Sequence, residues 1–360
     1  MTSENSTRQV RYGIIGSGHM GIEHMLNIRI SEDAEVVAFA DPNETSRKWG
    51  RDTAGPAARE YKDYRDLLAD TEVDAVIIST PNYTHVDVLA DVFQTTKHIL
   101  TEKPLCTTLE DCSKVEEAAA KHPGVVWVAM EYRYIPAASR LIEEVHSGRL
   151  GQLRMLAIRE HREPFLVKTG DWNRFNRNTG GTLVEKCCHF FDLMNLITRD
   201  RPVRVYASGG QDVNHLDERY DSEVPDILDN AYTIVDFAGG CRAMLDLCMF
   251  SEGSRNHNEI AAVGDRGKVE CFIPESKVVS SGREAESVET FHIPVEDRIL
   301  KAGFHEGSTY FEHQGFLKAV REGGKPEVTI RDGLRAVALG IAAQRSIEER
   351  RPVEMSELGL

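Results

Sequence analysis

Short apolar runs alternate with amphipathic segments through the first third of the chain. The runs are rich in β-branched and aromatic residues, are bounded by turn residues, and comprise residues 12–15, 36–40, 73–79, 98–101 and 125–130. They predict buried strands, whereas residues 84–94 and 108–121 carry the periodicity of helices. Strands that alternate with helices predict a doubly wound parallel sheet with right-handed crossovers. We therefore expect an α/β domain over residues 1–130.

The pattern changes beyond residue 130. Residues 136–146 predict a helix that Gly148 closes. Longer strand-like runs follow at residues 153–159, 203–207, 231–237, 242–250, 259–263 and 268–272. Glycine-rich turns between them favour antiparallel pairing, so we expect residues 131–360 to form an α+β domain with a large, mainly antiparallel open sheet. A last helix over residues 332–349 is able to pack back on either domain.

Length and charge narrow the class of protein. A chain of 360 residues is typical of two domains. Its 43 basic and 58 acidic residues leave a net charge of -15, which nucleic acid and anionic membranes would repel. No apolar run is long enough to span a bilayer, and residues 1–6 lack the basic and apolar regions of a secretion signal. We expect a cytoplasmic protein that binds neither nucleic acid nor membrane.

Cysteine and histidine spacing gives no sign of a metal centre. The seven cysteines contain no C-x-x-C pair, and the thirteen histidines contain no H-E-x-x-H motif. An odd, scattered set of cysteines in a large chain favours reduced thiols over a disulfide framework. We therefore expect free thiols and no metal site.

A glycine-rich turn follows the first strand-like run. It consists of Gly16-Ser17-Gly18-His19-Met20-Gly21. In such a turn the first glycine permits the tight bend, the second lets the backbone approach a pyrophosphate, and the third lets the helix pack closely on the sheet. The amino end of the next helix then offers free N–H groups to the phosphates. This pattern predicts a dinucleotide site, although a glycine turn without a ligand has the same local sequence.

Asp41 ends the second strand-like run, about 20 residues after the turn, as the dinucleotide fingerprint requires. Its carboxylate is suited to accept hydrogen bonds from the adenine ribose and to repel a 2′-phosphate, which favours NAD over NADP. Arg47 lies six residues later and leaves NADP open as the less favoured cofactor.

Glu102-Lys103-Pro104 follows the fourth strand-like run, at the carboxyl edge of the sheet where ligands bind in open α/β folds. A lysine beside the nicotinamide is able to exchange a proton with a substrate hydroxyl. By itself, however, a charged pair before proline is more often a solvated turn.

A second candidate cluster lies between Gly180 and Asp192. If this apolar segment is one helix, Glu185, His189 and Asp192 share a face at i, i+4 and i+7. Ionisable groups on a buried helix need partners or a chemical role. A histidine–carboxylate pair satisfied within the core is the alternative.

Together these motifs resemble the glucose-fructose oxidoreductase and inositol dehydrogenase (Gfo/Idh/MocA) family. The resemblance covers nearly the whole chain, and it rests on the glycine turn, Asp41, residues 80–85, residues 102–104, residues 180–192, residues 316–320 and residues 332–334. It implies a Rossmann domain that binds NAD, followed by a substrate-binding and oligomerisation domain. It also implies catalytic roles for Lys103 and His189, with Glu185 where the family commonly has aspartate. Glu185 therefore either contacts substrate or orders His189 and the adjacent Lys186.

The resemblance also implies further site residues. On the cofactor edge it places Thr80, Pro81, Asn82, His85 and Glu102. As substrate contacts we expect Arg133, Arg162, Trp172, Arg174, Asp192 and His305. Residues 161–176 are rich in donors and suit a polyhydroxylated ligand, although an exposed loop has the same composition. The expected reaction is hydride transfer between NAD and a secondary hydroxyl of a cyclic polyol, sugar or glycoside, in a homodimer or homotetramer formed through the open sheet.

Two other functions fit the same residues. A regulatory protein on this fold is able to sense NAD without catalysis. A redox-assisted glycosidase would oxidise a sugar transiently and consume no net NAD. An acid–base pair at Lys103 and His189 favours the dehydrogenase over the sensor, because a sensor needs no such pair.

Overall fold

The computed structural model describes residues 8–284 and 288–360, so residues 1–6, which carried the argument against a secretion signal, lie outside it. The chain divides into two compact units. Among the described residues, the first unit comprises 8–134 and 295–334, and the second comprises 135–284, 288–294 and 335–360. Our prediction placed all of residues 131–360 in the second domain, whereas the segment 295–334 groups with the first unit.

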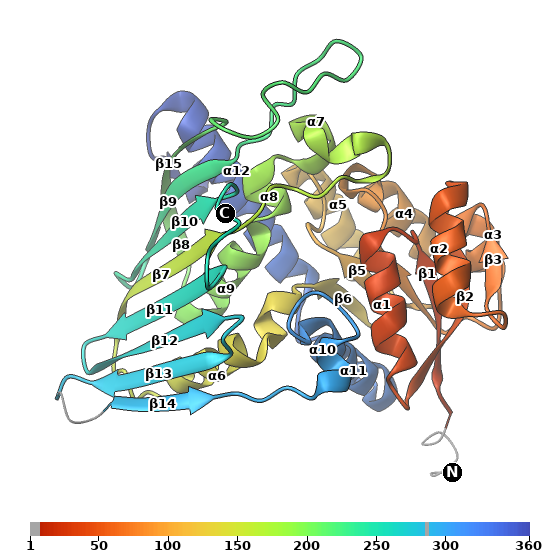
Figure 1. The fold of residues 1–360 in the computed structure, drawn as a ribbon, viewed down its shortest axis with the longest axis horizontal. Helices are drawn as coiled ribbons and strands as arrows, with labels where there is room; N and C mark the ends of the chain where they lie inside the picture. The colour runs from red at the N-terminus through yellow and green to blue at the C-terminus, as the bar shows by residue number, and fades with distance from the viewer. Residues whose placement is uncertain (1–7, 285–287) are drawn as a thin grey trace. The chain divides into compact units, whose positions relative to one another are not determined.

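The first unit is built on a six-stranded sheet with the order β3-β2-β1-β4-β5-β6 (Figure 1). Its strands are β1 (Val10–Ile15), β2 (Ala34–Ala40), β3 (Arg59–Tyr61), β4 (Ala75–Ile78), β5 (His98–Glu102) and β6 (Val126–Ala129). All neighbouring strands pair in parallel. This topology confirms the doubly wound parallel sheet. The carboxyl ends of β1, β2, β4 and β5 therefore share one sheet edge.

Helices connect these strands and extend the unit. They are α1 (His19–Arg29), α2 (Glu44–Ala54), α3 (Tyr64–Ala69), η1 (Asn82–Thr84), α4 (His85–Val92), α5 (Leu109–Ala119), η2 (Glu131–Tyr134), α10 (Asp297–Leu300) and α11 (Ser308–Glu322). The strands supply fully buried side chains such as Ile14, Phe39 and Trp127 to the core. Helix α11 packs on α1 and η2, which explains why the late segment belongs to this unit.

The second unit is built on a nine-stranded sheet with the order β14-β13-β12-β11-β7-β10-β9-β8-β15. Its strands are β7 (Leu153–His161), β8 (Pro202–Gly210), β9 (Asn230–Phe237), β10 (Arg242–Cys248), β11 (Asn258–Gly264), β12 (Gly267–Ile273), β13 (Lys277–Gly282), β14 (Val288–His292) and β15 (Val353–Glu354). Only β7 and β10 pair in parallel among the described strands of this sheet. The mainly antiparallel sheet is thus confirmed.

One face of this sheet is covered by helices. The unit contains α6 (Pro136–His146), η3 (Thr169–Arg174), α7 (Asn176–Thr179), α8 (Thr182–Glu185), α9 (Cys188–Thr198), the later part of α12 (Ile330–Glu349) and η4 (Met355–Leu358). Helix α6 packs on β12 and β13, and α9 packs on β7. Alternate strand residues are buried beneath them, as expected for a sheet with one covered face.

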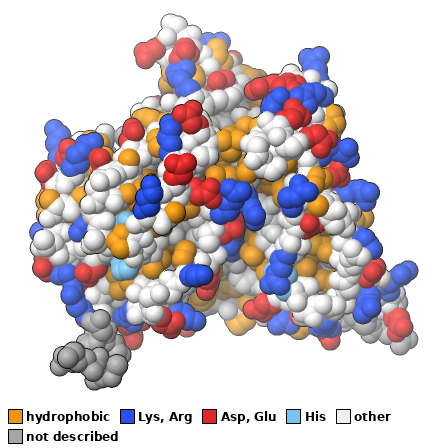
Figure 2. Space-filling model, turned by 180° about the vertical axis from the view of Figure 1, so that it is seen from behind, with side chains coloured by type: hydrophobic (Ala, Val, Ile, Leu, Met, Phe, Trp, Pro, Cys, Tyr) orange, Lys and Arg blue, Asp and Glu red, His pale blue; other side chains and the backbone are white. Residues whose placement is uncertain are grey.

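No helix in residues 8–284 or 288–360 is long and apolar enough to cross a membrane. The face of the molecule shown in Figure 2 carries interspersed acidic and basic side chains. The seven cysteines are free, as the scattered spacing predicted.

Candidate active site

The three glycines of the turn after β1 differ in what surrounds them. Gly16 has a φ of +95°, and a Cβ there would lie 2.6 Å from the carbonyl oxygen of Ser79. A Cβ on Gly21 would lie 2.0 Å from the carbonyl oxygen of Gly16. A Cβ on Gly18, the N-cap of α1, would meet no atom within 4 Å. Packing therefore requires the first and third glycines, whereas Gly18 borders open space at the amino end of α1.

Asp41 lies directly after β2 and is bonded to the glycine turn. Its Oδ2 accepts a hydrogen bond from the backbone N–H of Ser17 at 2.9 Å, and its Oδ1 accepts one from Asn43 at 2.8 Å. These bonds hold the carboxylate beside the turn, where the fingerprint needs an acceptor for the ribose.

The guanidinium of Arg47 is shared among neighbouring acceptors. It pairs with Glu44 and with Glu60, and it donates to the carbonyl oxygens of Asp41 and Pro42 at 2.8 and 2.9 Å. Two carboxylates therefore balance its charge, and this favours NAD over a cofactor with a 2′-phosphate.

The loop after β4 carries a buried donor that lacks a protein partner. Asn82 is 6% exposed, and its Nδ2 has no hydrogen-bond partner in the structure. β4 is the neighbour of β1, so this loop adjoins the glycine turn. An unmet amide donor suits a bound ligand that offers acceptors. Thr80 and Pro81 precede Asn82 in the same loop.

His85 joins this loop to the turn after β5. The ring is fully buried, with Nδ1 2.9 Å from the carbonyl oxygen of Pro104 and Nε2 3.0 Å from that of Thr80. Burial lowers the pKa of His85, although both carbonyl groups favour its protonated form. His85 therefore links the two loops, while His19 and Met20 occupy the first turn of α1.

Trp49, on α2, was not among the predicted site residues. Its indole is 39% exposed, and its ring centroid lies 5.9 Å from that of His19. The sequence signal that could have identified Trp49 is an aromatic residue on the helix that follows Asp41. The open space at Gly18, the carboxylate of Asp41, the free donor on Asn82 and the exposed Trp49 fit a dinucleotide. These residues would hold NAD.

Glu102 and Lys103 lie at the carboxyl end of β5, on the same sheet edge as the glycine turn. Glu102 is 4% exposed and Lys103 is partly exposed. The backbone N–H of Lys103 donates to Glu102 Oε2 at 3.1 Å, and His24 Nε2 lies 3.0 Å from Glu102 Oε1. His24, on α1, carried no signal in the sequence.

Two predicted substrate residues in the first unit are tied to neighbouring segments. His305 Nδ1 lies 2.9 Å from Glu23 Oε1, a buried carboxylate on α1. The Arg133 guanidinium donates to the carbonyl oxygen of Glu327 at 3.2 Å and lies 3.7 Å from Asp332. These contacts hold both side chains within the first unit.

In the second unit, Glu185 and His189 belong to two helices. Helix α8 ends at Glu185, residues 186–187 form a turn, and α9 begins at Cys188. The expectation of one continuous helical face was therefore wrong for Glu185, because the chain turns before α9 starts. His189 and Asp192 do share α9, and all three side chains are at most 6% exposed.

Lys186, beside Glu185, forms an ion pair with a carboxylate on β7. Its Nζ lies 2.9 Å from Oε1 of Glu160, a fully buried carboxylate on β7. Arg162 lies 3.3 Å from the same oxygen, and Asn258 donates to the other. Glu160 thus anchors the turn between α8 and α9 to the sheet.

The remaining predicted substrate residues lie on and beside η3. Arg174 is 2% exposed and pairs with Glu218 at 3.0 Å. Trp172 is half-buried, and its carbonyl oxygen accepts a hydrogen bond from Asn178 at 2.9 Å. Asp171, directly before Trp172, adopts a left-handed conformation with a φ of +51°.

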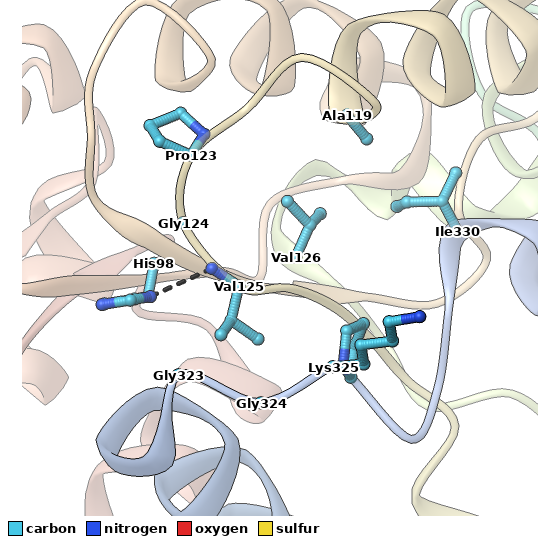
Figure 3. Close-up of a pocket in the computed structure, with 11 residues that line it drawn as sticks. His98, Ala119, Pro123, Gly124, Val125, Val126, Gly323, Gly324, Lys325 and Ile330 are labelled. Atoms are coloured by element: carbon cyan, nitrogen blue, oxygen red, sulfur yellow. Dashed lines mark hydrogen bonds between the residues drawn. The ribbon is translucent and has the colours of Figure 1, made fainter.

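A separate pocket of about 320 Å³ opens at the amino ends of β5 and β6. Figure 3 shows His98, whose Nδ1 accepts a hydrogen bond from the backbone N–H of Val125 at 3.0 Å, together with Lys325 and Ile330. Lys103 follows the opposite end of β5, so this pocket is separate from the candidate active site.

Comparison with protein families identifies both parts of the chain. Residues 10–130 match the oxidoreductase family's NAD-binding Rossmann fold, and residues 142–355 match its C-terminal alpha/beta domain. The chain belongs to the Gfo/Idh/MocA oxidoreductase family. Membership confirms the predicted family, the NAD-binding Rossmann domain and the assignment as an NAD-dependent oxidoreductase.

Several proteins are similar to this chain over nearly its whole length. Myo-inositol 2-dehydrogenase of Thermotoga maritima is 26% identical over 352 residues, which are 97% of this chain and 99% of that protein. The scyllo-inositol 2-dehydrogenase (NAD(+)) of Bacillus subtilis is 28% identical over 363 residues and 96% of both chains. A crystal structure of a probable dehydrogenase from Thermotoga maritima has a TM-score of 0.78 at 26% identity, covering 96% of this chain and 99% of that one.

Proposed function

We propose that this oxidoreductase transfers a hydride between a secondary hydroxyl of a cyclic polyol or sugar and NAD. The observation that carries the proposal is the position of Lys103 at the same sheet edge as the glycine turn and Asp41. Relatives that cover nearly the whole chain are named as inositol 2-dehydrogenases, which supports a cyclic polyol as the substrate class.

Each candidate catalytic residue has one role in the proposal. The Lys103 ammonium donates a hydrogen bond to the reacting oxygen and stabilises its developing negative charge. Neutral His189 accepts the hydroxyl proton as the general base. When bound, NAD supplies the nicotinamide ring that takes the hydride. In the reverse direction the same two residues return a proton to a ketone.

Two acidic residues close to His189 in sequence, Glu185 and Asp192, have different roles in the proposal. Asp192 lies one turn after His189 on α9 and is 1% exposed. Glu185 precedes the turn that Lys186 and Glu160 anchor to β7. We assign Glu185 to ordering His189, and Asp192 to the substrate hydroxyls.

The other proposed substrate-binding residues donate hydrogen bonds or present an aromatic ring. We propose substrate contacts for Arg133, Arg162, Trp172, Arg174 and His305. Four of them already bond to carboxylates or carbonyl oxygens of their own unit, which fixes their orientation before a ligand binds. Such preorganised donors suit a polyhydroxylated ring.

A substrate screen tests the proposal. Purified protein is incubated with NAD or NADP and a panel of inositols, aldoses and glucosides, and NADH formation and substrate loss are both measured. The proposal predicts NADH formation with at least one polyol or sugar, and a preference for NAD. NAD binding with no turnover would support the sensor, and substrate loss without NADH would support the redox-assisted glycosidase.

We also propose that a second copy of the chain covers the open face of the nine-stranded sheet, in a homodimer or homotetramer. Large apolar side chains are exposed on that face, with Tyr206, Ile234 and Met244 paired side by side across β8, β9 and β10. Tyr232, on the same face of β9, is 64% exposed. Burying such a patch favours association.

Light scattering after size-exclusion chromatography tests the oligomer. The wild-type protein should have at least twice the mass of one chain. Ile234→Lys should reduce that mass, whereas Val213→Lys, at an exposed position outside the sheet, should not. A monomeric wild-type protein would overturn this proposal.

A further inference from the structure

Three buried ionisable side chains form a hydrogen-bonded chain behind Lys103. His24 Nε2 lies 3.0 Å from Glu102 Oε1, and His24 Nδ1 lies 3.0 Å from His313 Nε2. Glu102, His24 and His313 are 4%, 0% and 1% exposed. They come from β5, α1 and α11, three elements that are distant in sequence and belong to the first unit.

The hydrogen positions follow from the donors that each group needs. Glu102 as a carboxylate only accepts hydrogen bonds, so His24 Nε2 carries a hydrogen. The 3.0 Å contact between His24 Nδ1 and His313 Nε2 needs one more hydrogen, which either ring is able to supply. Burial, and after it the neighbouring His24, hold the pKa of His313 well below its usual value, so His313 is neutral.

Both oxygens of Glu102 are occupied. Oε1 receives His24, and Oε2 accepts the backbone N–H of Lys103 at 3.1 Å. Burial alone would raise the pKa of Glu102, but the hydrogen bond from His24 and the charges of His24 and Lys103 outweigh it, so the pKa lies below its usual value. The interaction is reciprocal, because an ionised Glu102 stabilises the ammonium form of Lys103.

Two other buried carboxyl groups, Glu131 and Glu312, behave in the opposite way. Burial and the charge of Glu102 raise the pKa of Glu131 to about 7. Burial, followed by the charges of Glu131 and Glu102, raises the pKa of Glu312 well above its usual value, and the bond from Trp127 at 3.3 Å does not offset this. Of the three groups, Glu102 is the one that accepts a hydrogen bond from His24.

We propose that His24, oriented by His313, is a positioning residue that keeps Glu102 ionised and aligned against the backbone of Lys103, and so preserves the Lys103 ammonium at working pH. The inference rests on the proposed function only for the catalytic role of Lys103. The charged or titratable groups that interact with Glu102 are Lys103, His24, His85, Glu131 and Glu312.

The direct test measures the titration of Glu102 without any substrate. In protein labelled with ¹³C at the glutamate carboxyl groups, the Glu102 signal is assigned by its loss in Glu102→Gln and followed against pH. Wild-type Glu102 should titrate below the usual glutamate value, and a value above it would overturn the inference. His24→Leu should raise the Glu102 pKa by about two units or more.

Three further variants distinguish a positioning role of His24 from a general loss of protein stability. Gln at position 24 places a donor near the position of Nε2 and an acceptor for His313, so His24→Gln should recover most of the wild-type titration. His313→Leu should shift Glu102 in the same direction as His24→Leu, but less. His122→Leu removes a comparable bond, 2.8 Å from the Lys97 carbonyl oxygen, and should leave Glu102 unchanged. Equal shifts in His24→Leu and His24→Gln, or no shift in either, would overturn the inference.

The pH profile of kcat/KM links the titration to catalysis. With the polyol that the wild-type enzyme oxidises, His24→Leu should lower kcat by about tenfold or more and move the basic limb toward lower pH, because Glu102 is then no longer held in place beside Lys103 and stabilises its ammonium form less. Binding of NADH should change little. An unchanged basic limb despite a shifted Glu102 would overturn the link to Lys103. If Lys103→Met itself retained turnover, the proposed function would fail, and the substrate-free titration would still test His24.

Discussion

The Asp41 carboxylate accepts a hydrogen bond from the backbone N–H of Ser17 at 2.9 Å. This bond places the acidic residue beside the glycine turn, although 24 positions separate the two residues. Asp41→Ala removes the acceptor and the negative charge that disfavours a 2′-phosphate. The ratio of kcat/KM for NAD to that for NADP should fall by about tenfold or more. Asp52→Ser, on the exposed side of α2, is the control, and an equal change in both variants would contradict the role of Asp41.

The glycine turn predicts opposite effects for two alanine substitutions. Gly21→Ala brings a Cβ to 2.0 Å from the Gly16 carbonyl oxygen, so it should destabilise the protein by about 1–3 kcal/mol. Gly18→Ala meets no atom within 4 Å, so it should leave stability within about 0.5 kcal/mol but weaken NAD binding by about tenfold or more. Thermal unfolding and NAD titration separate the two. Normal NAD affinity in Gly18→Ala would show that no phosphate approaches this position.

The apolar runs predicted most elements of both sheets because burial leaves a periodic signal in the sequence. Strand β14 was missed for the converse reason: it is a largely exposed edge strand and carries no such signal. The assignment of residues 295–334 to the first unit was also missed. That grouping involves contacts such as Glu23 with His305, which are 282 residues apart, and local patterns do not encode such pairs.

Local motifs alone were enough to propose Gly16, Asp41 and Lys103 as site residues. Their surroundings were not predictable. Helical spacing suggested one face for Glu185 and His189, but the turn at residues 186–187 separates α8 from α9. His24 escaped notice because its importance comes from Glu102 on another strand.

The buried pair of Lys186 and Glu160 should stabilise the second unit. Lys186→Met leaves Glu160 with Arg162 and Asn258 but without its closest cation, which should cost about 2–3 kcal/mol. The double variant Lys186→Met, Glu160→Gln should recover part of this loss, because no buried charge remains uncompensated. Denaturant unfolding measures both, with Lys268→Met, from an ion pair that is only partly buried, as the control. No loss in Lys186→Met would show that the pair is not needed.

The raised pKa of Glu131 predicts that the protein becomes less stable as the pH rises. Its pKa is about 7 in the folded protein, compared with 4.5 as the ordinary value. Between these values the folded state holds an extra proton, so the free energy of unfolding falls as pH rises through this window. The variant Glu131→Gln has no proton to lose at this position. The free energy of unfolding of the variant minus that of the wild type should therefore rise by about 3 kcal/mol between roughly pH 5 and pH 8. Glu117→Gln, an exposed change on α5, should show no such trend. A pH-independent difference for Glu131→Gln would contradict the raised pKa.

The measurement that tests the central claim most directly is the rate of NADH formation from the best polyol in the screen, compared between wild type, Lys103→Met and His189→Gln. Binding of NAD is measured in parallel, and Lys114→Met and His122→Gln, at positions to which no role in the site is assigned, serve as controls. If the two residues are the acid–base groups, each variant should lose about a hundredfold or more in kcat while still binding NAD. Near wild-type turnover in either variant would contradict the account.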